Sequence, residues 1–269
     1  MKQKNPYVIA IDLDNTIVTG FDNYDAETFE YIKKISNENY IVISTGRPYR
    51  SSKYFYDKLG LKTPIVNYNG ALVHHPYDSS FSKTMITVDK NDIIKFIEHN
   101  KDILVNIFCE IEDEIFVWQF NDFIEPYLHL DGGNLHVGDF KDTLYGNPNG
   151  AIVFSIKGSE ANLECYFRKY APHLRIRFWD CDECVICEVY NPATSKANAL
   201  TKICEFYNVP LSNLIAIGDG HNDIEMLELA GLGVAMENGH PDLIKIANKV
   251  VPSVHKRGVL VFIKEFFRI

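Results

Sequence analysis

Short apolar runs that end abruptly in polar residues constrain the fold of this chain more than any other feature. The first run, Tyr7 to Ile11, is rich in β-branched residues and is followed directly by Asp12. A continuous apolar run of this length is typical of a strand that is buried on both faces of a parallel sheet. Because ligands bind beyond the carboxyl ends of such strands, we expect the segment after Ile11 to carry a functional site.

The same alternation of strand and helix patterns returns near both ends of the chain. This alternation predicts helices at 26–37, 195–207 and 223–230 and strands at 40–43, 214–217 and 233–235. A further unit ends near residues 64–71, where an apolar segment breaks into an Asn-Gly turn. This order predicts an α/β fold built on a parallel sheet.

The middle of the chain, from about residue 83 to residue 190, has a different pattern. We expect strands at 85–88, 103–108, 115–120 and 151–156, helices at 89–101 and 159–170, and a final strand pair that ends at 190. The sequence therefore predicts a Rossmann-like core formed by residues 1–83 and 191–269. An inserted α+β domain, residues 84–190, interrupts this core.

Charge and hydropathy exclude several functional classes. The 269 residues carry a formal net charge of −9, whereas nucleic-acid surfaces need clustered Lys and Arg. No apolar run approaches the ~20 residues needed to span a bilayer, and the first six residues lack the apolar segment of a secretory signal. We expect a cytoplasmic protein without a nucleic-acid or membrane partner, and leave its oligomeric state open.

Three of the six cysteines, Cys181, Cys184 and Cys187, are spaced in a way that suggests a metal or redox site. The segment 184–190 has a strand pattern, however, so Cys184 and Cys187 would face opposite sides of the strand. We therefore expect thiols that pack as small apolar residues and keep a metal or redox role as the alternative.

Four polar clusters stand where a predicted strand ends or a helix begins. Taken singly, each is weak evidence, since such residues more often cap helices or close turns; this structural explanation is most serious for Thr45. The order of the four clusters along the chain, together with their positions at strand ends and helix starts, is a much more specific signal. The clusters are DLDNT at residues 12–16, STGR at 44–47, Ser195-Lys196, and GDGHND at 218–223.

With these four motifs the sequence resembles the haloacid dehalogenase superfamily of phosphatases. The position of the insertion, between the second and third motifs, is similar to that of the Cof-type hydrolases with a large α+β cap (C2B type). Asn15 and Ala197 replace glycines that are common in the family, and Lys256-Arg257-Gly258 stands where relatives often have an acidic residue. Asn tolerates a positive φ better than other residues with a side chain, so the change at Asn15 is mild.

The resemblance implies a chemistry for each motif residue. Asp12 would be a covalent nucleophile that forms an aspartyl-phosphate, and Asp14 would protonate the leaving group and then activate water. Thr45 and Lys196 would stabilise the transferred phosphoryl group. Mg²⁺ would be held by Asp12, the backbone carbonyl of Asp14, Asp219 and, in or just behind the ligand shell, Asp223, while Asn222 and Arg47 would bind substrate.

The resemblance also implies the reaction and its alternatives. The expected activity is Mg²⁺-dependent hydrolysis of small phosphomonoesters, with sugar phosphates, pyridoxal phosphate and flavin mononucleotide as plausible substrates. The cap would close over the site and supply most substrate contacts, from residues that the sequence does not identify. A phosphosugar mutase, a receiver-like phosphoacceptor and a catalytically retired phosphate-binding protein are the alternatives; Asp14, as an acid/base, argues against a long-lived phosphorylated receiver.

Overall fold

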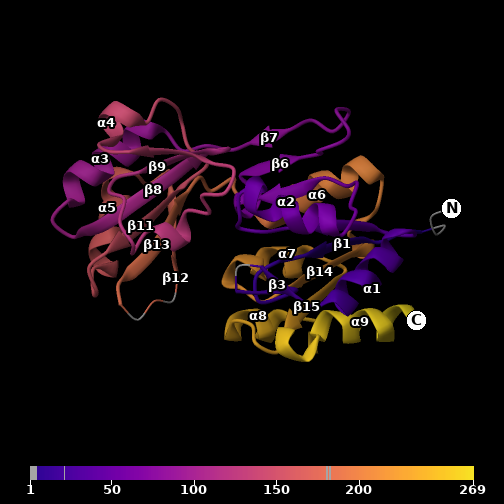
Figure 1. The fold of residues 1–269 in the computed structure, drawn as a ribbon. Helices are drawn as coiled ribbons and strands as arrows, with labels where there is room; N and C mark the ends of the chain where they lie inside the picture. The colour runs from indigo at the N-terminus through magenta and orange to yellow at the C-terminus, as the bar shows by residue number, and fades with distance from the viewer. Residues whose placement is uncertain (1–4, 21, 180, 182) are drawn as a thin grey trace. The chain divides into compact units, whose positions relative to one another are not determined.

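The computed structural model describes residues 5–20, 22–179, 181 and 183–269. They form two compact units (Figure 1). The core unit comprises Met1–Arg47, Ser52–Thr84 and Ser195–Ile269, and the inserted unit comprises Pro48–Ser51 and Met85–Thr194. The α/β class expected from the sequence is confirmed. The domain division expected from the sequence, residues 1–83 with 191–269 and residues 84–190, stays a prediction.

The core unit is built on a parallel sheet, which within the described residues has five strands in the order β16-β15-β14-β1-β4. These are β1 (Val8–Ile11), β4 (Tyr40–Ile43), β14 (Leu214–Gly218), β15 (Leu232–Met236) and β16 (Lys249–Val251). Strand β1 is fully buried and pairs in parallel with β14 on one side and β4 on the other. The carboxyl ends of β1, β4 and β14, each followed by a polar motif, therefore meet at one edge of the sheet.

Helices cover both faces of this sheet. Helices α6 (Lys196–Tyr207) and α7 (Ile224–Leu229) contribute Leu200, Ile203 and Leu227 to an apolar cluster that contains Val8 and Ala10 of β1. Figure 1 shows α1 (Ala26–Ser36) and α9 (Gly258–Phe267) on the opposite side of the sheet from α6. The remaining core helices are α2 (Tyr49–Lys58), whose first residues group with the inserted unit, and α8 (Pro241–Ile246).

Two small sheets complete the core unit. Strands β2 (Val18–Thr19) and β3 (Asn23–Tyr24) form a hairpin after the DLDNT motif. A second sheet has the order β5-β6-β7, with β5 at Ile65–Asn67, β6 at Leu72–His74 and β7 at Thr84–Met85. The strand expected at 85–88 is thus replaced by the shorter β7, which belongs to this small sheet. Lys202 of α6 donates a hydrogen bond to the Ser82 carbonyl (2.6 Å), so the segment leading out of the core lies beside the helix at which the chain returns.

The inserted unit is a mixed sheet with helices on one face. Among the described residues its strand order is β10-β9-β8-β11-β13-β12. The elements are α3 (Lys90–Asn100), β8 (Leu104–Ile111), β9 (Glu114–Val117), β10 (Asn134–Val137), α4 (Phe140–Thr143), β11 (Ala151–Ser155), α5 (Glu160–Tyr170), β12 (Arg175–Trp179) and β13 (Val185–Tyr190). The sequence pattern did not predict β10, because this edge strand is largely exposed and lacks a buried apolar face.

Each face of this sheet has its own apolar cluster. The cluster under α3 and α5 contains Phe96, Phe167 and Cys187, whereas the opposite cluster contains Phe154 and Cys184. Cys184 and Cys187 therefore lie on opposite faces of the sheet, as the strand pattern predicted.

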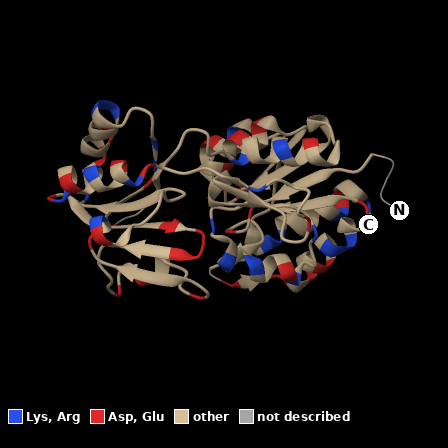
Figure 2. Ribbon diagram, turned by 90° about the horizontal axis from the view of Figure 1, so that it is seen from above, with Lys and Arg blue, Asp and Glu red and all other residues tan. Residues whose placement is uncertain are grey.

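The surface of both units carries charges of both signs. Figure 2 shows Lys and Arg interspersed with Asp and Glu along the helices. Glu27 of α1, for example, pairs with Arg257 and with Lys264 of α9, both at 2.8 Å. No helix in the described parts of the chain is long and apolar enough to cross a membrane.

We predict that Phe96→Ala destabilises the inserted unit by about 3–5 kcal/mol, the usual cost of removing a large buried aromatic side chain. Phe96 is fully buried, and its ring centroid lies 5.1 Å from that of Phe167. Urea unfolding followed by hydrogen exchange should show the loss in residues 85–194 and little change in the core unit. Tyr170→Ala, at a half-exposed position, is the control. An equal loss of protection in both units would show that they unfold as one.

Candidate active site

Three carboxylates converge at the carboxyl edge of the parallel sheet. Asp12 directly follows β1, and its backbone N–H donates to the Ile217 carbonyl of β14 (3.0 Å). Asp219 directly follows β14, and Asp223 lies one helical turn further along. Asp12, Asp219 and Asp223 each offer an oxygen within 4.8 Å of the others, so these residues form an acidic cluster that could hold a metal ion.

Lys196 places a positive charge within this cluster. Its Nζ lies 2.7 Å from Oδ1 of Asp12 and 2.6 Å from Oδ1 of Asp223, and its side chain is fully buried. Ser195 starts helix α6 by accepting a hydrogen bond from the backbone N–H of Ala197 (3.1 Å), as a helix N-cap does. The lysine therefore sits in the first turn of a helix, where the dipole disfavours a cation unless anions face it.

A close backbone contact fixes where α6 begins. Gly70 has φ of +103°, and a Cβ at this position would lie 2.3 Å from the Ser195 carbonyl oxygen. No other residue can occupy this position without moving the chain. The Asn-Gly turn that the sequence suggested thus supports Lys196 directly.

The charges of the cluster alter one another's protonation. Burial raises the pKa of Asp12 well above its ordinary value, and Lys196 only partly offsets this. Burial, together with the charge of Asp223, raises the pKa of Asp219 to about 7. Burial opposes the charge on Lys196, but the carboxylates of Asp12 and Asp223 outweigh it and raise the lysine pKa. The cluster thus has more acids than Lys196 alone can neutralise. Its carboxylate oxygens are hard donors, which fit a divalent cation such as Mg²⁺.

The GDGHND loop is folded around Asp223. Its Oδ2 accepts hydrogen bonds from the backbone N–H groups of Asp219 (3.0 Å) and Gly220 (2.9 Å). A Cβ on Gly218 would lie 2.4 Å from the same oxygen, so glycine is required there. Asp223 therefore shapes the loop that presents Asp219. Thr16, which was not singled out from the sequence, donates its hydroxyl to Asp219 Oδ1 (3.2 Å).

Thr45 and Asn222 are held by a residue that sequence reasoning assigned only to a turn. Asn69 donates its backbone N–H to the Thr45 carbonyl (3.0 Å), and its Oδ1 accepts from the Asn222 amide (2.8 Å). Thr45 is fully buried, and its hydroxyl accepts from the Arg47 N–H (3.1 Å). Asn69 links the second and fourth motifs, a role that its place in the Asn-Gly turn did not reveal.

Asp14 is paired with Arg47. The Arg47 Nε donates to Asp14 Oδ2 (2.9 Å), and its terminal nitrogen reaches Oδ1, which makes a fork on one carboxylate. The Arg47 guanidinium is nearly buried and lies 5.4 Å from the Phe55 ring centroid, whereas Asp14 is about half exposed. Arg47 therefore contacts the expected acid/base, and its expected contact with substrate stays a prediction. Asn15 has φ of 55°, which confirms that Asn occupies a left-handed position here.

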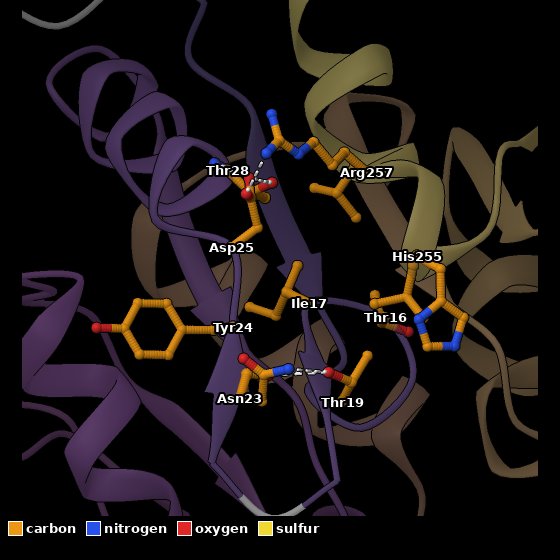
Figure 3. Close-up of a pocket in the computed structure, with 11 residues that line it drawn as sticks. Thr16, Ile17, Thr19, Asn23, Tyr24, Asp25, Thr28, His255 and Arg257 are labelled. Carbon is orange, nitrogen blue, oxygen red and sulfur yellow. Dashed lines mark hydrogen bonds and ion pairs between the residues drawn. The ribbon is translucent and has the colours of Figure 1, made fainter.

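A cavity of about 260 Å³ opens behind the DLDNT loop (Figure 3). It is lined by the β2–β3 hairpin, the start of α1 and the segment that leads into α9. Arg257, in the segment where the sequence departs from the family pattern, lines it and pairs with Asp25 (3.0 Å). Thr16 also lines the cavity, but none of the three acids of the cluster does.

The chain matches proteins of known class over nearly its full length. Residues 9–263 match the family model described as haloacid dehalogenase-like hydrolase. It is 33% identical to the 5-amino-6-(5-phospho-D-ribitylamino)uracil phosphatase YitU of Bacillus subtilis, over 98% of this chain and 99% of that protein. It is 26% identical to the pyridoxal phosphate phosphatase YbhA of Escherichia coli, over 91% of this chain and 92% of that protein.

Solved structures have the same fold. A haloacid dehalogenase-like hydrolase from Bacteroides thetaiotaomicron superposes with a TM-score of 0.82 at 20% identity and covers 98% of this chain and 100% of its own. A sugar phosphatase described as HAD subclass IIB superposes with a TM-score of 0.81 at 19% identity, with the same coverage. The relatives named here are phosphatases, that is, phosphoric monoester hydrolases. The sequence match and the shared fold together show that this chain belongs to the haloacid dehalogenase-like hydrolases of the Cof type.

Proposed function

We propose that this chain is a Mg²⁺-dependent phosphatase that hydrolyses small phosphomonoesters through an aspartyl-phosphate on Asp12. The contact of Asp12 with Lys196 inside an acidic cluster is the observation that carries the proposal. A nucleophilic carboxylate must lie beside positive charge, because a phosphomonoester is itself anionic and would otherwise be repelled.

The acidic cluster of Asp12, Asp219 and Asp223, with the backbone carbonyl of Asp14, would hold the Mg²⁺. When bound, this ion neutralises the phosphoryl oxygens and the carboxylates around them. Lys196 contacts both Asp12 and Asp223, so its positive charge reduces the repulsion between these two buried acids.

Asp12 supplies the electron pair of the first step. A carboxylate oxygen of Asp12 forms a bond to phosphorus while the ester P–O bond breaks, and the leaving oxygen takes a proton from Asp14. In the second step Asp14, now a carboxylate, removes a proton from water, whose oxygen bonds to phosphorus and releases Asp12 with inorganic phosphate. Thr45 follows β4 at the carboxyl edge of the parallel sheet. Its hydroxyl is proposed to donate a hydrogen bond to a phosphoryl oxygen.

Arg47 is proposed to position Asp14. Its fork fixes the orientation of the carboxylate, which is otherwise half exposed and free to rotate. Orientation matters because general acid catalysis requires hydrogen-bond reach to the leaving oxygen.

The substrate is proposed to be a phosphorylated metabolite with a small polar or heterocyclic leaving group. This follows from the relatives that are named for a phosphorylated ribitylaminouracil and for pyridoxal phosphate. Sugar phosphates and flavin mononucleotide are further phosphomonoesters that belong in the same panel.

We predict that the purified protein releases inorganic phosphate from at least one member of such a panel in Mg²⁺, and that chelation or Asp12→Asn abolishes release. Asp12→Asn keeps the shape of the side chain but removes the nucleophilic charge. Malachite-green phosphate detection and product analysis provide the measurement. An isomeric phosphosugar in place of free phosphate would favour a mutase, and no turnover of any monoester would rule out the proposal.

We predict that Arg47→Lys lowers kcat about 10²-fold with little change in KM, because a misplaced catalytic group typically costs that much. Lysine keeps the charge of Arg47 but cannot make the fork. Steady-state kinetics on the best substrate separates the two roles: a raised KM with unchanged kcat would mean that Arg47 binds substrate instead. Arg175→Lys, at an exposed position of β12 in the inserted unit, is the matched control.

We predict that Lys196→Met lowers the stability of the core unit by about 3–5 kcal/mol in EDTA, since removal of one partner leaves buried acids without a counter-charge. Addition of Mg²⁺ should restore part of this loss. Chemical unfolding with and without Mg²⁺ measures both effects, and Lys245→Met, at an exposed ion pair, is the control. A midpoint equal to that of the wild type in EDTA would contradict this account of the cluster.

A further inference from the structure

Two cysteines meet in the connection between strands β12 and β13 of the inserted unit. The Sγ atoms of Cys181 and Cys184 lie 3.4 Å apart, which places the two sulfur atoms in direct contact. Cys184 is buried in the apolar cluster that also contains Ile124, Leu128 and Ile186, whereas Cys181 is only partly buried. Neither thiol belongs to the candidate active site.

This pair lacks the partners of a metal centre. Cys187, the third cysteine in the sequence pattern, is buried in the cluster on the other face of the sheet. A structural zinc site needs about four ligands from such side chains. Within the part of the chain that the structure describes, Asp12, Asp219 and Asp223 make up the one group of three or more side chains that could hold a metal. Dithiol chemistry is the function that the pair can still perform.

The two thiols have different environments. Hydrogen bonds from the backbone N–H groups of Cys184 and Glu183, and then from the Cys184 thiol, lower the pKa of Cys181. Burial, followed by the contact with Cys181, raises the pKa of Cys184 to about 11. A partly exposed cysteine with a lowered pKa beside a buried cysteine with a raised pKa is suited to thiol–disulfide exchange, because the first attacks and the second resolves.

We propose that Cys181 and Cys184 form a reversible intramolecular disulfide by exchange with a low-molecular-weight disulfide. The Cys181 thiolate attacks the disulfide R–S–S–R, which forms a mixed disulfide and releases one RS⁻. Cys184 then loses its proton and attacks the Cys181 sulfur, which forms the Cys181–Cys184 bond and releases the second RS⁻. The two thiol hydrogens of the protein end on two RSH molecules, so the protein loses two electrons and the oxidant gains them.

The short distance between the two sulfur atoms favours attack by Cys184, so the mixed disulfide on Cys181 should not accumulate. The sulfur atoms are already in contact, so ring closure is an intramolecular reaction with a high effective concentration. The bridge would hold the β12–β13 connection to the apolar cluster in which Cys184 is buried. This inference is independent of the proposed phosphatase activity.

The test is oxidation of the reduced full-length protein by glutathione disulfide, followed by alkylation of the remaining thiols. We expect the wild type to lose two hydrogens and to retain four of its six alkylation sites. Trypsin cleaves after Arg177, and glutamyl endopeptidase cleaves after Glu183 and Glu188. Digestion with both enzymes should therefore release the peptides 178–183 and 184–188 joined by the new disulfide bond. Cys187 should be alkylated, and dithiothreitol should restore all six sites.

Variants separate the proposed pair from adventitious oxidation. Cys165→Ser removes an exposed thiol on α5 and should oxidise like the wild type. Cys184→Ser should stop at a glutathione adduct on Cys181, and Cys181→Ser should form no internal bridge. The proposal is overturned if the wild type keeps six alkylation sites, stops at the glutathione adduct, or pairs through Cys165 or Cys187.

Discussion

The buried ammonium group of Lys196 is the interaction on which the candidate site depends. It contacts Asp12, which lies 184 positions away in the sequence, and Asp223, which lies 27 positions away. Buried ion pairs rarely add net stability, because removal of charged groups from water costs about as much as their attraction returns. The lysine is therefore better understood as the residue that permits two acids to share a dry site than as a source of folding energy.

Steric constraints on the backbone place this lysine as firmly as electrostatics do. Gly70 lets one turn approach the start of α6, and Gly218 lets the Asp223 carboxylate lie against the end of β14. Both glycines are needed for close approach, and only Gly70 also has a positive φ. The position of Lys196 and the shape of the GDGHND loop thus follow from two places where a side chain would not fit.

The parts of the fold that sequence could predict are those with a local physical signal. Strand β1 is buried on both faces and appears as an unbroken apolar run, and the polar residues after it mark the end of the strand. The same signal predicted the edge of the sheet at which Asp12 and Asp219 meet. Strand β10 gave no such signal, because its side chains are mostly exposed at a sheet edge.

Side-chain partners were beyond local prediction. The pairing of Asp14 with Arg47, and of Asn69 with Asn222, joins segments whose relative orientation depends on the packing of the whole core. Sequence identified three of these four residues as polar members of motifs, yet neither their directions nor their partners follow from spacing along the chain. No local signal in the sequence marks Thr16 either, since its contact with Asp219 depends on two strands being neighbours.

The contact between Lys202 and Ser82 has a consequence for how such a protein can diversify. The segment Met85–Thr194 leaves the core unit and comes back to it next to the same helix, so this segment is a side branch whose two ends are close together. Replacement of that branch by a longer, shorter or unrelated one leaves the spacing of the core strands unchanged. Evolution can therefore exchange the branch as a module while the carboxylates and the lysine keep their geometry.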